Sequence, residues 1–208
     1  MNRALKVLGI AAVAALAMSV VASAAQATEF TASEYPSSFH GSNTSGEEVF
    51  STEAGDVKCD SEFSGEAKEA SSSVTAHAEY SECEAFGFVN ATVDTEGCDY
   101  VFNLPAEGTT ATVDVACGEG ESIKITAASC AAEVGAQEDL EHVGFANGTG
   151  ETEDEVEVTA TATEIAYTVT KDGFLCPFSG TGTKEDGSYT TEGAATKITD
   201  DEHSLDVG

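Results

Sequence analysis

Carboxylates are the most abundant side chains in this chain that could do chemistry. Asp and Glu number 38 against eight Lys and Arg, a formal net charge of −30. Two carboxylates can act as acid and base on a glycoside when a cleft holds them at a defined separation, usually beside aromatic rings. The chain has no Trp and only five Tyr, which weakens that hypothesis. The acidic clusters at 151–155 and 200–202 could bind Ca²⁺, but neither contains a D-x-D-x-D-G loop, so a solvated, salt-adapted surface is preferred.

Histidine and serine show no spacing typical of a site. The four histidines lie in four separate segments, at His40, His77, His142 and His203. Zinc sites usually need close spacings such as C-x-x-C or H-x-x-x-H, and neither is present. There is also no G-x-S-x-G elbow, phosphate loop or dinucleotide fingerprint. The sequence therefore predicts no catalytic residue, no metal site and no cofactor.

Six cysteines carry the clearest chemical signal. They are Cys59, Cys83, Cys98, Cys117, Cys130 and Cys176. In an exported chain an even number of cysteines predicts disulfides, and each of three bonds closing loops of this length would contribute roughly 3 to 4 kcal/mol. Among the possible connectivities we prefer the sequential one, Cys59–Cys83, Cys98–Cys117 and Cys130–Cys176. The third pair is simply what the first two leave.

The segment 98–117 supports the second pair because it has the pattern of a complete β-hairpin. Alternate residues are apolar on both arms, and Pro105 to Gly108 is a turn cluster between them. If Cys98 faces Cys117, every opposed pair of residue numbers sums to 215, which places Tyr100 opposite Val115 and Phe102 opposite Val113. All the large apolar side chains then share one face, which we expect to be core.

The other strand signals are weaker. A hairpin over Cys59–Cys83 is also expected. If Cys59 lies directly opposite Cys83, however, Phe63 falls opposite Glu79, and Tyr80 falls on the opposite face of the sheet from Phe63. A bulge or a different partner is therefore needed. The alternation over 151–170 changes phase at Thr163-Glu164, which predicts a bulge or bend. About twelve short strands without helical periodicity predict an all-β, single-domain, antiparallel sandwich or barrel.

The segment 1–27 has the pattern of a signal peptide. A basic start precedes an apolar run at 7–21, and Ala25-Gln26-Ala27 is a cleavage site, so we expect cleavage after Ala27 and an exported, secreted or envelope protein. No second apolar run is long enough to span a membrane. The chain after Ala27 keeps every acidic side chain and loses two of the eight basic ones. Nucleic acid and anionic membranes are therefore poor partners, whereas cations or basic proteins are compatible with the charge.

The domain boundaries follow from the same patterns: a signal peptide at 1–27, an all-β domain at 28–199 and a flexible acidic tail at 200–208. Leu, Ile, Val and Phe together make up less than a fifth of the chain after Ala27, and a fifth is the share that usually separates a packed domain from a disordered chain. Composition alone would favour disorder. The expected disulfides are what make a thin core plausible.

A run of motifs resembles a group of uncharacterised small secreted, cysteine-containing β-proteins of actinobacterial type. These motifs are AGDVKC, FSG, AEYSECEAFGF, GCDYVF, VDVAC, ITAASC and DGFLCPFSGTGT, between about residues 50 and 185. The group has no established activity. The resemblance implies export, an all-β fold and the six-cysteine framework, and it implies no catalytic residue.

Three function hypotheses follow. The preferred one is a non-catalytic secreted or envelope-associated β protein with a binding or structural role, and therefore not an enzyme. The second is a secreted hydrolase whose site is assembled from scattered carboxylate, Ser and His residues. The third is an acidic surface protein that responds to Ca²⁺ or salt, since relief of self-repulsion should stabilise so charged a chain.

Overall fold

The computed structural model describes residues 29–43, 46–105, 111–148, 155–174, 176–192, 196–200 and 205–208. The described chain consists of strands and turns, and it is all-β as predicted. The strands are β1 (Phe30–Ala32), β2 (Ser37–Asn43), β3 (Glu47–Thr52), β4 (Gly55–Ala67), β5 (Ser73–Ala85), β6 (Val89–Asp94), β7 (Cys98–Asn103), β8 (Ala111–Cys117), β9 (Ile123–Ala127), β10 (Cys130–Val134), β11 (Gln137–Asn147), β12 (Glu155–Asp172), β13 (Gly182–Glu192), β14 (Thr196–Asp200) and β15 (Leu205–Val207).

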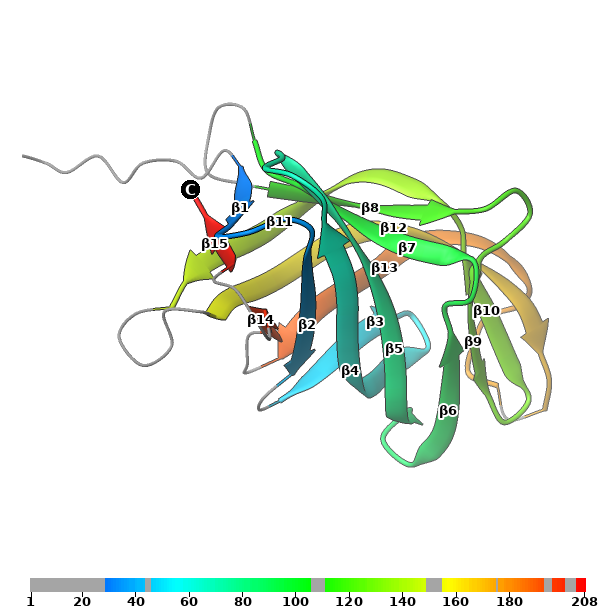
Figure 1. Cartoon of the computed structure of the whole chain (residues 1–208). Helices are drawn as coiled ribbons and strands as arrows, with labels where there is room; N and C mark the ends of the chain where they lie inside the picture. The colour runs from blue at the N-terminus through cyan, green and yellow to red at the C-terminus, as the bar shows by residue number, and fades with distance from the viewer. Residues whose placement is uncertain are drawn as a thin grey trace, which may run out of the picture.

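Eight strands close into a barrel (Figure 1). The ring runs β4–β5–β7–β8–β11–β12–β13–β3 and returns to β4, and every pairing in it is antiparallel. Of the two architectures left open by the sequence, sandwich and barrel, the chain adopts the barrel. Closure removes the exposed edges that an open sheet of this size would present.

The remaining strands extend the barrel at its two ends. At one end β6, β9 and β10 form a second route from β5 to β12. At the other end β2 and β14 connect β4 to β12. Figure 1 shows these two groups on opposite sides of the molecule. The long strands β4, β5 and β12 therefore run through both ends and hold them together.

Each end has its own hydrophobic cluster. One is built around Phe39, Phe63, Phe102 and the valines of β8, β11 and β12. The other is built around Ile123, Ile125, Ile165 and Tyr167. Four half-buried side chains pack against both clusters, namely Tyr80, Tyr100, Leu140 and Tyr189. The middle of the barrel is thus the place where two cores meet.

The three disulfides have the predicted sequential pairing, Cys59–Cys83, Cys98–Cys117 and Cys130–Cys176. The hairpin of β7 and β8 has the predicted register, since Cys98 lies opposite Cys117, Tyr100 opposite Val115 and Phe102 opposite Val113. Disulfides form and persist in oxidising compartments, so the three bonds indicate an extracellular or comparable environment.

The ambiguous hairpin of β4 and β5 is resolved by a bulge. The register shifts between Lys58 and Asp60, and Glu82 on β5 has a positive φ of 50°. Phe63 therefore lies opposite Ala78, not Glu79. The extra residue changes which side of β5 faces inward, so Tyr80 and Cys83 both point into the barrel although their numbers differ in parity.

The phase change predicted in β12 is also present. The pairing with β13 shifts between Ala162 and Ile165, and Glu164 between them has a φ of 59°. Ala160 and Ala162 face inward before the bulge, and Ile165, Tyr167 and Val169 face inward after it. This long strand can therefore keep its apolar side in the core while it bends between the two clusters.

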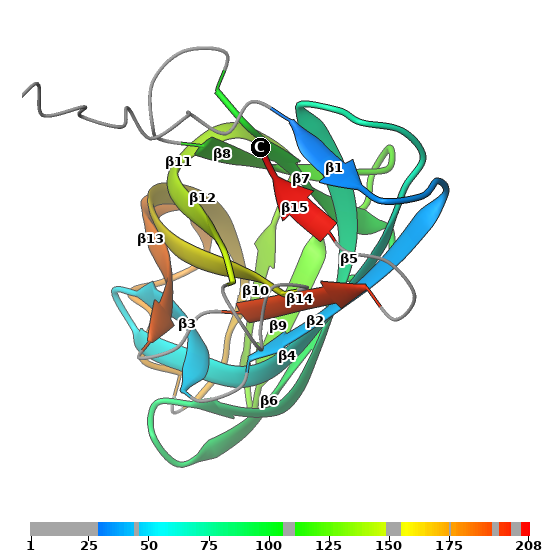
Figure 2. The same cartoon turned by 60° about the vertical axis from the view of Figure 1, so that its left-hand side comes forward.

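The two ends of the described chain pair with each other. Phe30 to Ala32 in β1 lie antiparallel to Leu205–Val207 in β15, and both strands lie toward the viewer in Figure 2. Within the acidic tail that the sequence analysis expects at 200–208, Leu205–Val207 form β15, and Val207 is buried. Residues 201–204 and the expected signal peptide at 1–27 lie outside the described residues.

Candidate cavity in the barrel

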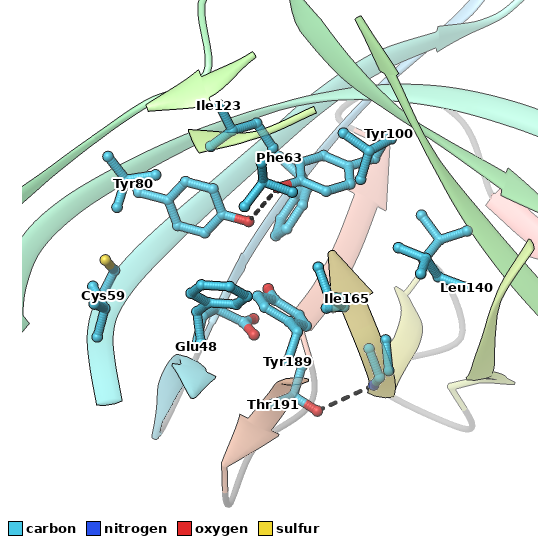
Figure 3. Close-up of a pocket in the computed structure, with 18 of the residues that line it drawn as sticks. Glu48, Cys59, Phe63, Tyr80, Tyr100, Ile123, Leu140, Ile165, Tyr189 and Thr191 are labelled. Carbon is cyan, nitrogen blue, oxygen red and sulfur yellow. Dashed lines mark hydrogen bonds between the residues drawn. The ribbon is translucent and has the colours of Figure 1, made fainter. Parts of the chain in front are cut away.

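A cavity of about 100 Å³ lies where the two clusters meet (Figure 3). The strands from β3 to β13 all contribute to its wall, and only five of the lining side chains carry a polar atom outside a disulfide: Glu48, Tyr80, Tyr100, Tyr189 and Thr191. The interior of an eight-stranded barrel is either filled by side chains or holds one small ligand. Here side chains leave space between the two clusters unfilled.

The cavity exists because the core residues are small. Of the 32 buried hydrophobic residues among those described, 19 are Ala or Val. On the wall contributed by β12, Val158, Ala160 and Ala162 face the cavity before the bulge. The sequence has so little Leu and Ile that its composition resembles that of a disordered chain. In the folded protein, the same shortage of large apolar side chains leaves space unfilled.

The polar side chains gather on one side of the cavity. Figure 3 shows the hydroxyls of Tyr80, Tyr100 and Tyr189 pointing toward one another above the Glu48 carboxylate. The Tyr80 and Tyr100 oxygens are 3.1 Å apart. The Tyr189 hydroxyl lies between this pair and the Glu48 carboxylate. Three hydroxyls and one carboxylate therefore gather at one side of the cavity, and we call these four residues the Tyr–Glu cluster.

Glu48 lies at the base of this cluster and is only 2% exposed. It alternates with Phe50 on β3, and both side chains face the cavity. The buried Ser61 hydroxyl donates a hydrogen bond of 3.3 Å to Glu48 Oε1. A buried carboxylate needs hydrogen-bond donors around it, and Ser61 supplies one here.

Aromatic rings hold the cluster in place. The Phe63 ring packs edge-on against Tyr100 at 6.1 Å and against Tyr80 at 6.4 Å between ring centroids. Tyr189 is opposite Phe50 in the pairing of β13 with β3. The hydroxyls are therefore positioned by rings that are themselves packed on neighbouring strands, which favours a preformed site over one that assembles on binding.

Burial keeps the three phenols of the cluster neutral. Loss of hydration raises the pKa of Tyr100 to about 12, and it raises the pKa values of Tyr80 and Tyr189 well above the ordinary value. The mutual proximity of the phenols and the negative charge of Glu48 raise the pKa values of Tyr80 and Tyr189 further. At neutral pH the cluster therefore presents hydroxyl groups, not phenolates, to the cavity.

The segment that follows β12 packs against the hydrophobic cluster that contains Tyr167. Phe178 packs on Tyr167 at 6.0 Å, and Tyr167 in turn packs on Phe50. The Tyr167 hydroxyl donates to Asp186 at 3.0 Å, and burial is the main reason that the pKa of Tyr167 is raised to about 12. The disulfide at Cys176 fastens the beginning of this segment to β10.

The same segment is held to the β3–β4 turn by Glu53. Ser179 Oγ donates to Glu53 Oε1 at 2.8 Å, and Lys184 Nζ forms an ion pair with the same oxygen at 3.0 Å. The hydrogen bond from Lys184 is the main reason that the pKa of Glu53 is lowered.

The residues that the sequence singled out for chemistry lie away from the cavity. His77 Nδ1 contacts Asp99 Oδ1 at 3.0 Å on the outer surface of β5 and β7. His40 lines a separate surface groove with Glu62, Glu79 and Glu155. His142 is exposed on β11, and His203 lies outside the described residues, as does most of the 151–155 cluster. Within the described ranges no group of three or more His, Cys, Asp or Glu is arranged to hold a metal ion.

The Tyr–Glu cluster was not singled out as a site from the sequence. Tyr100 was expected only as a core residue, and Tyr80 was assigned to the opposite face by simple pairing. Two signals were available: the shared parity of Glu48 with Phe50, and the conflict in register that a bulge in β5 would remove. Neither indicates that positions 48, 80, 100 and 189 converge.

Comparisons with known proteins add no relative: no family model, no curated protein and no solved structure matches the chain. In the part of the chain that the structure describes, no helix is long and apolar enough to cross a membrane. The functional interpretation therefore depends on the geometry of the barrel.

Proposed function

We propose that this is an exported, non-catalytic protein that binds one small, largely apolar molecule inside its barrel. The observation that carries the proposal is the cavity of about 100 Å³ between two packed clusters, most of whose wall residues lack a polar side-chain atom. Cavities of comparable size and apolar lining exclude water and accept small hydrocarbons. The signal-peptide pattern at 1–27 and the three disulfides support export.

The geometry favours binding over the hydrolase hypothesis. A hydrolytic site needs a nucleophile or an activated water beside a base in a cleft that a substrate can enter. The His77–Asp99 contact is instead on the outer surface, with both side chains about half exposed. Glu48 is enclosed among neutral phenols and apolar side chains, which suits recognition of a ligand.

Cyclohexane is a suitable first probe because it is apolar and compact. The chain has no Trp, so its intrinsic fluorescence comes from five tyrosines, three of which line the cavity. Saturable binding should therefore change the tyrosine emission and raise the melting temperature with increasing ligand. The measurement uses the full exported chain with its disulfides intact.

A cavity-filling variant makes this test specific. Ala160→Leu places three more carbon atoms into the cavity from β12 and should abolish both responses without lowering the melting temperature. Ala116→Leu adds the same atoms on the exposed side of β8 and should leave both responses intact. Absence of saturable binding by the unmodified protein, or unchanged binding by Ala160→Leu, would refute the proposal.

A further inference from the structure

Two phenylalanine side chains project from the same end of the barrel. Among the described residues the exposed large hydrophobic side chains are Tyr35, Phe88 and Phe174, and Phe88 is 80% and Phe174 90% exposed. Phe88 lies in the turn between β5 and β6, and Phe174 follows β12. Since β9 pairs with β6 and β10 pairs with β12, the two phenylalanines lie on either side of the β9–β10 turn (Figure 1). We call the turns at 85–89, 128–129 and 173–174 the aromatic tip.

The backbone holds both phenylalanines in place. The Ser129 hydroxyl of the β9–β10 turn donates to the Phe174 carbonyl at 2.6 Å. In the turn before Phe88, Phe86 and Gly87 have φ values of 56° and 77°, and the Phe86 side chain packs against the hydrophobic cluster that contains Tyr167. The exposed rings are therefore carried by anchored turns, and their exposure is a property of the fold.

The aromatic tip is also uncharged. The segments 85–93, 125–132 and 173–183 contain no Asp, Glu, Lys or Arg, although these residues make up 22% of the chain. A single exposed hydrophobic side chain is ordinary on a protein surface. Two of them at one uncharged end form an apolar patch of the kind that marks a contact with a partner or a lipid surface.

The charge of the whole molecule restricts what this partner is. With a formal net charge of −30, the protein is repelled by anionic surfaces and by a second copy of itself. A zwitterionic lipid surface has no net charge, and its acyl chains accept projecting rings without a preformed pocket. A small apolar molecule of the class that the cavity binds also dissolves in lipid, and this last argument rests on the proposed function.

We infer that the aromatic tip docks the protein on a zwitterionic lipid surface, with the Phe88 and Phe174 rings inserted among the acyl chains. Binding of this kind increases with the apolar area that enters the membrane, so two rings give weak and reversible docking. The acidic surface on the rest of the barrel stays in water.

Vesicles of phosphatidylcholine test the docking by co-sedimentation with the full exported chain. Phe88→Ser and Phe174→Ser should each lower the partition coefficient by about tenfold or more, because each removes one ring from the bilayer. Tyr35→Ser removes an exposed aromatic ring outside the aromatic tip and should leave the partition coefficient unchanged. Vesicles of phosphatidylglycerol should bind at least about tenfold more weakly at low ionic strength, and NaCl should narrow this difference.

A fluorescent reporter shows whether the aromatic tip itself enters the lipid. The chain has no Trp, so Phe88→Trp introduces the sole indole. Its emission should shift to the blue on addition of phosphatidylcholine vesicles, and lipids brominated on the acyl chains should quench it. Tyr35→Trp is the matched control and should show neither effect.

Three results would overturn the inference: no binding of the unmodified protein to phosphatidylcholine, undiminished binding by both serine variants, or an unshifted Phe88→Trp emission. Self-association that Phe88→Ser abolishes, seen by sedimentation without lipid, would show that a second copy covers the aromatic tip instead. Cyclohexane binding by Phe88→Ser should equal that of the unmodified protein. If vesicles bind and cyclohexane does not, the proposed function fails and the docking stands.

Discussion

The Tyr–Glu cluster should make the fold sensitive to alkaline pH. Burial raises the pKa of Tyr100 to about 12 and the pKa values of Tyr80 and Tyr189 well above the ordinary value, whereas in the unfolded chain each phenol ionises near about pH 10. The folded protein therefore holds these three protons more tightly than the unfolded chain. Their contribution to stability is fully present below about pH 10 and is lost as the pH rises toward about 12.

The expected size of the effect follows from proton linkage. Each phenol that is ionised in the unfolded chain and neutral in the fold lowers the free energy of unfolding by about 1.4 kcal/mol per pH unit. The three phenols of the cluster give a slope of about 4 kcal/mol per pH unit once the pH is well above about 10. Tyr167, whose pKa is also raised to about 12, brings the total slope to about 5 kcal/mol per pH unit. A domain of ordinary stability has about 5 to 15 kcal/mol, so two pH units remove much or all of it.

Urea unfolding at a series of pH values, followed by circular dichroism, measures this slope directly. Tyr100→Phe should reduce it by about a quarter, since one of four linked protons is removed. Val143→Ala is the control, because it truncates a buried side chain outside the cavity and should lower stability equally at every pH. The reasoning is refuted if Tyr100→Phe keeps the full slope, or if tyrosinate absorbance reaches that of five phenolates while the β-sheet signal is still intact.

Two further predictions concern packing and charge. Gly65→Ala should lower the free energy of unfolding, measured in urea, by about 2 kcal/mol or more. The added Cβ on β4 would overlap the buried Phe39 ring and the Thr75 carbonyl. A loss below about 0.5 kcal/mol would contradict this close approach. The formal charge of −30 predicts that NaCl raises the melting temperature by screening repulsion among carboxylates. A larger rise in CaCl₂ at matched ionic strength would indicate specific cation sites. If neither salt raises the melting temperature, the salt-response hypothesis is wrong.

The parts of the fold that could be predicted are those in which two local signals agree. Over 98–117 the cysteine spacing and the apolar alternation require the same register, and β7 and β8 have it. At Thr163-Glu164 the apolar residues change from even to odd positions, and this change predicted the bulge that the structure has at Glu164. Over Cys59–Cys83 the register set by the cysteine spacing differed by one residue from the register that the apolar alternation requires. The bulge at Glu82 supplies the extra residue.

Closure of the barrel depends on pairings that no local pattern specifies. The strand β3 pairs with β13, which places Val49 opposite Thr190, and β2 pairs with β14 near the end of the chain. Alternation shows that a strand has an inner face, but it does not show which distant strand lies beside it. The choice between sandwich and barrel was therefore open, and so was any site built from the inner faces of several strands.

The thin core and the cavity have the same origin. A chain with so little Leu and Ile cannot fill an eight-stranded barrel, so its fold depends on three disulfides and on a closed hydrogen-bonded ring more than on bulk in the interior. The space that remains lies where the two clusters meet, and Ala160 and Ala162 border it. A bound hydrophobic molecule would supply the missing contacts to both clusters at once. Binding and stability are then linked, so a ligand that fills the cavity should stabilise the barrel in proportion to the logarithm of its concentration above the dissociation constant.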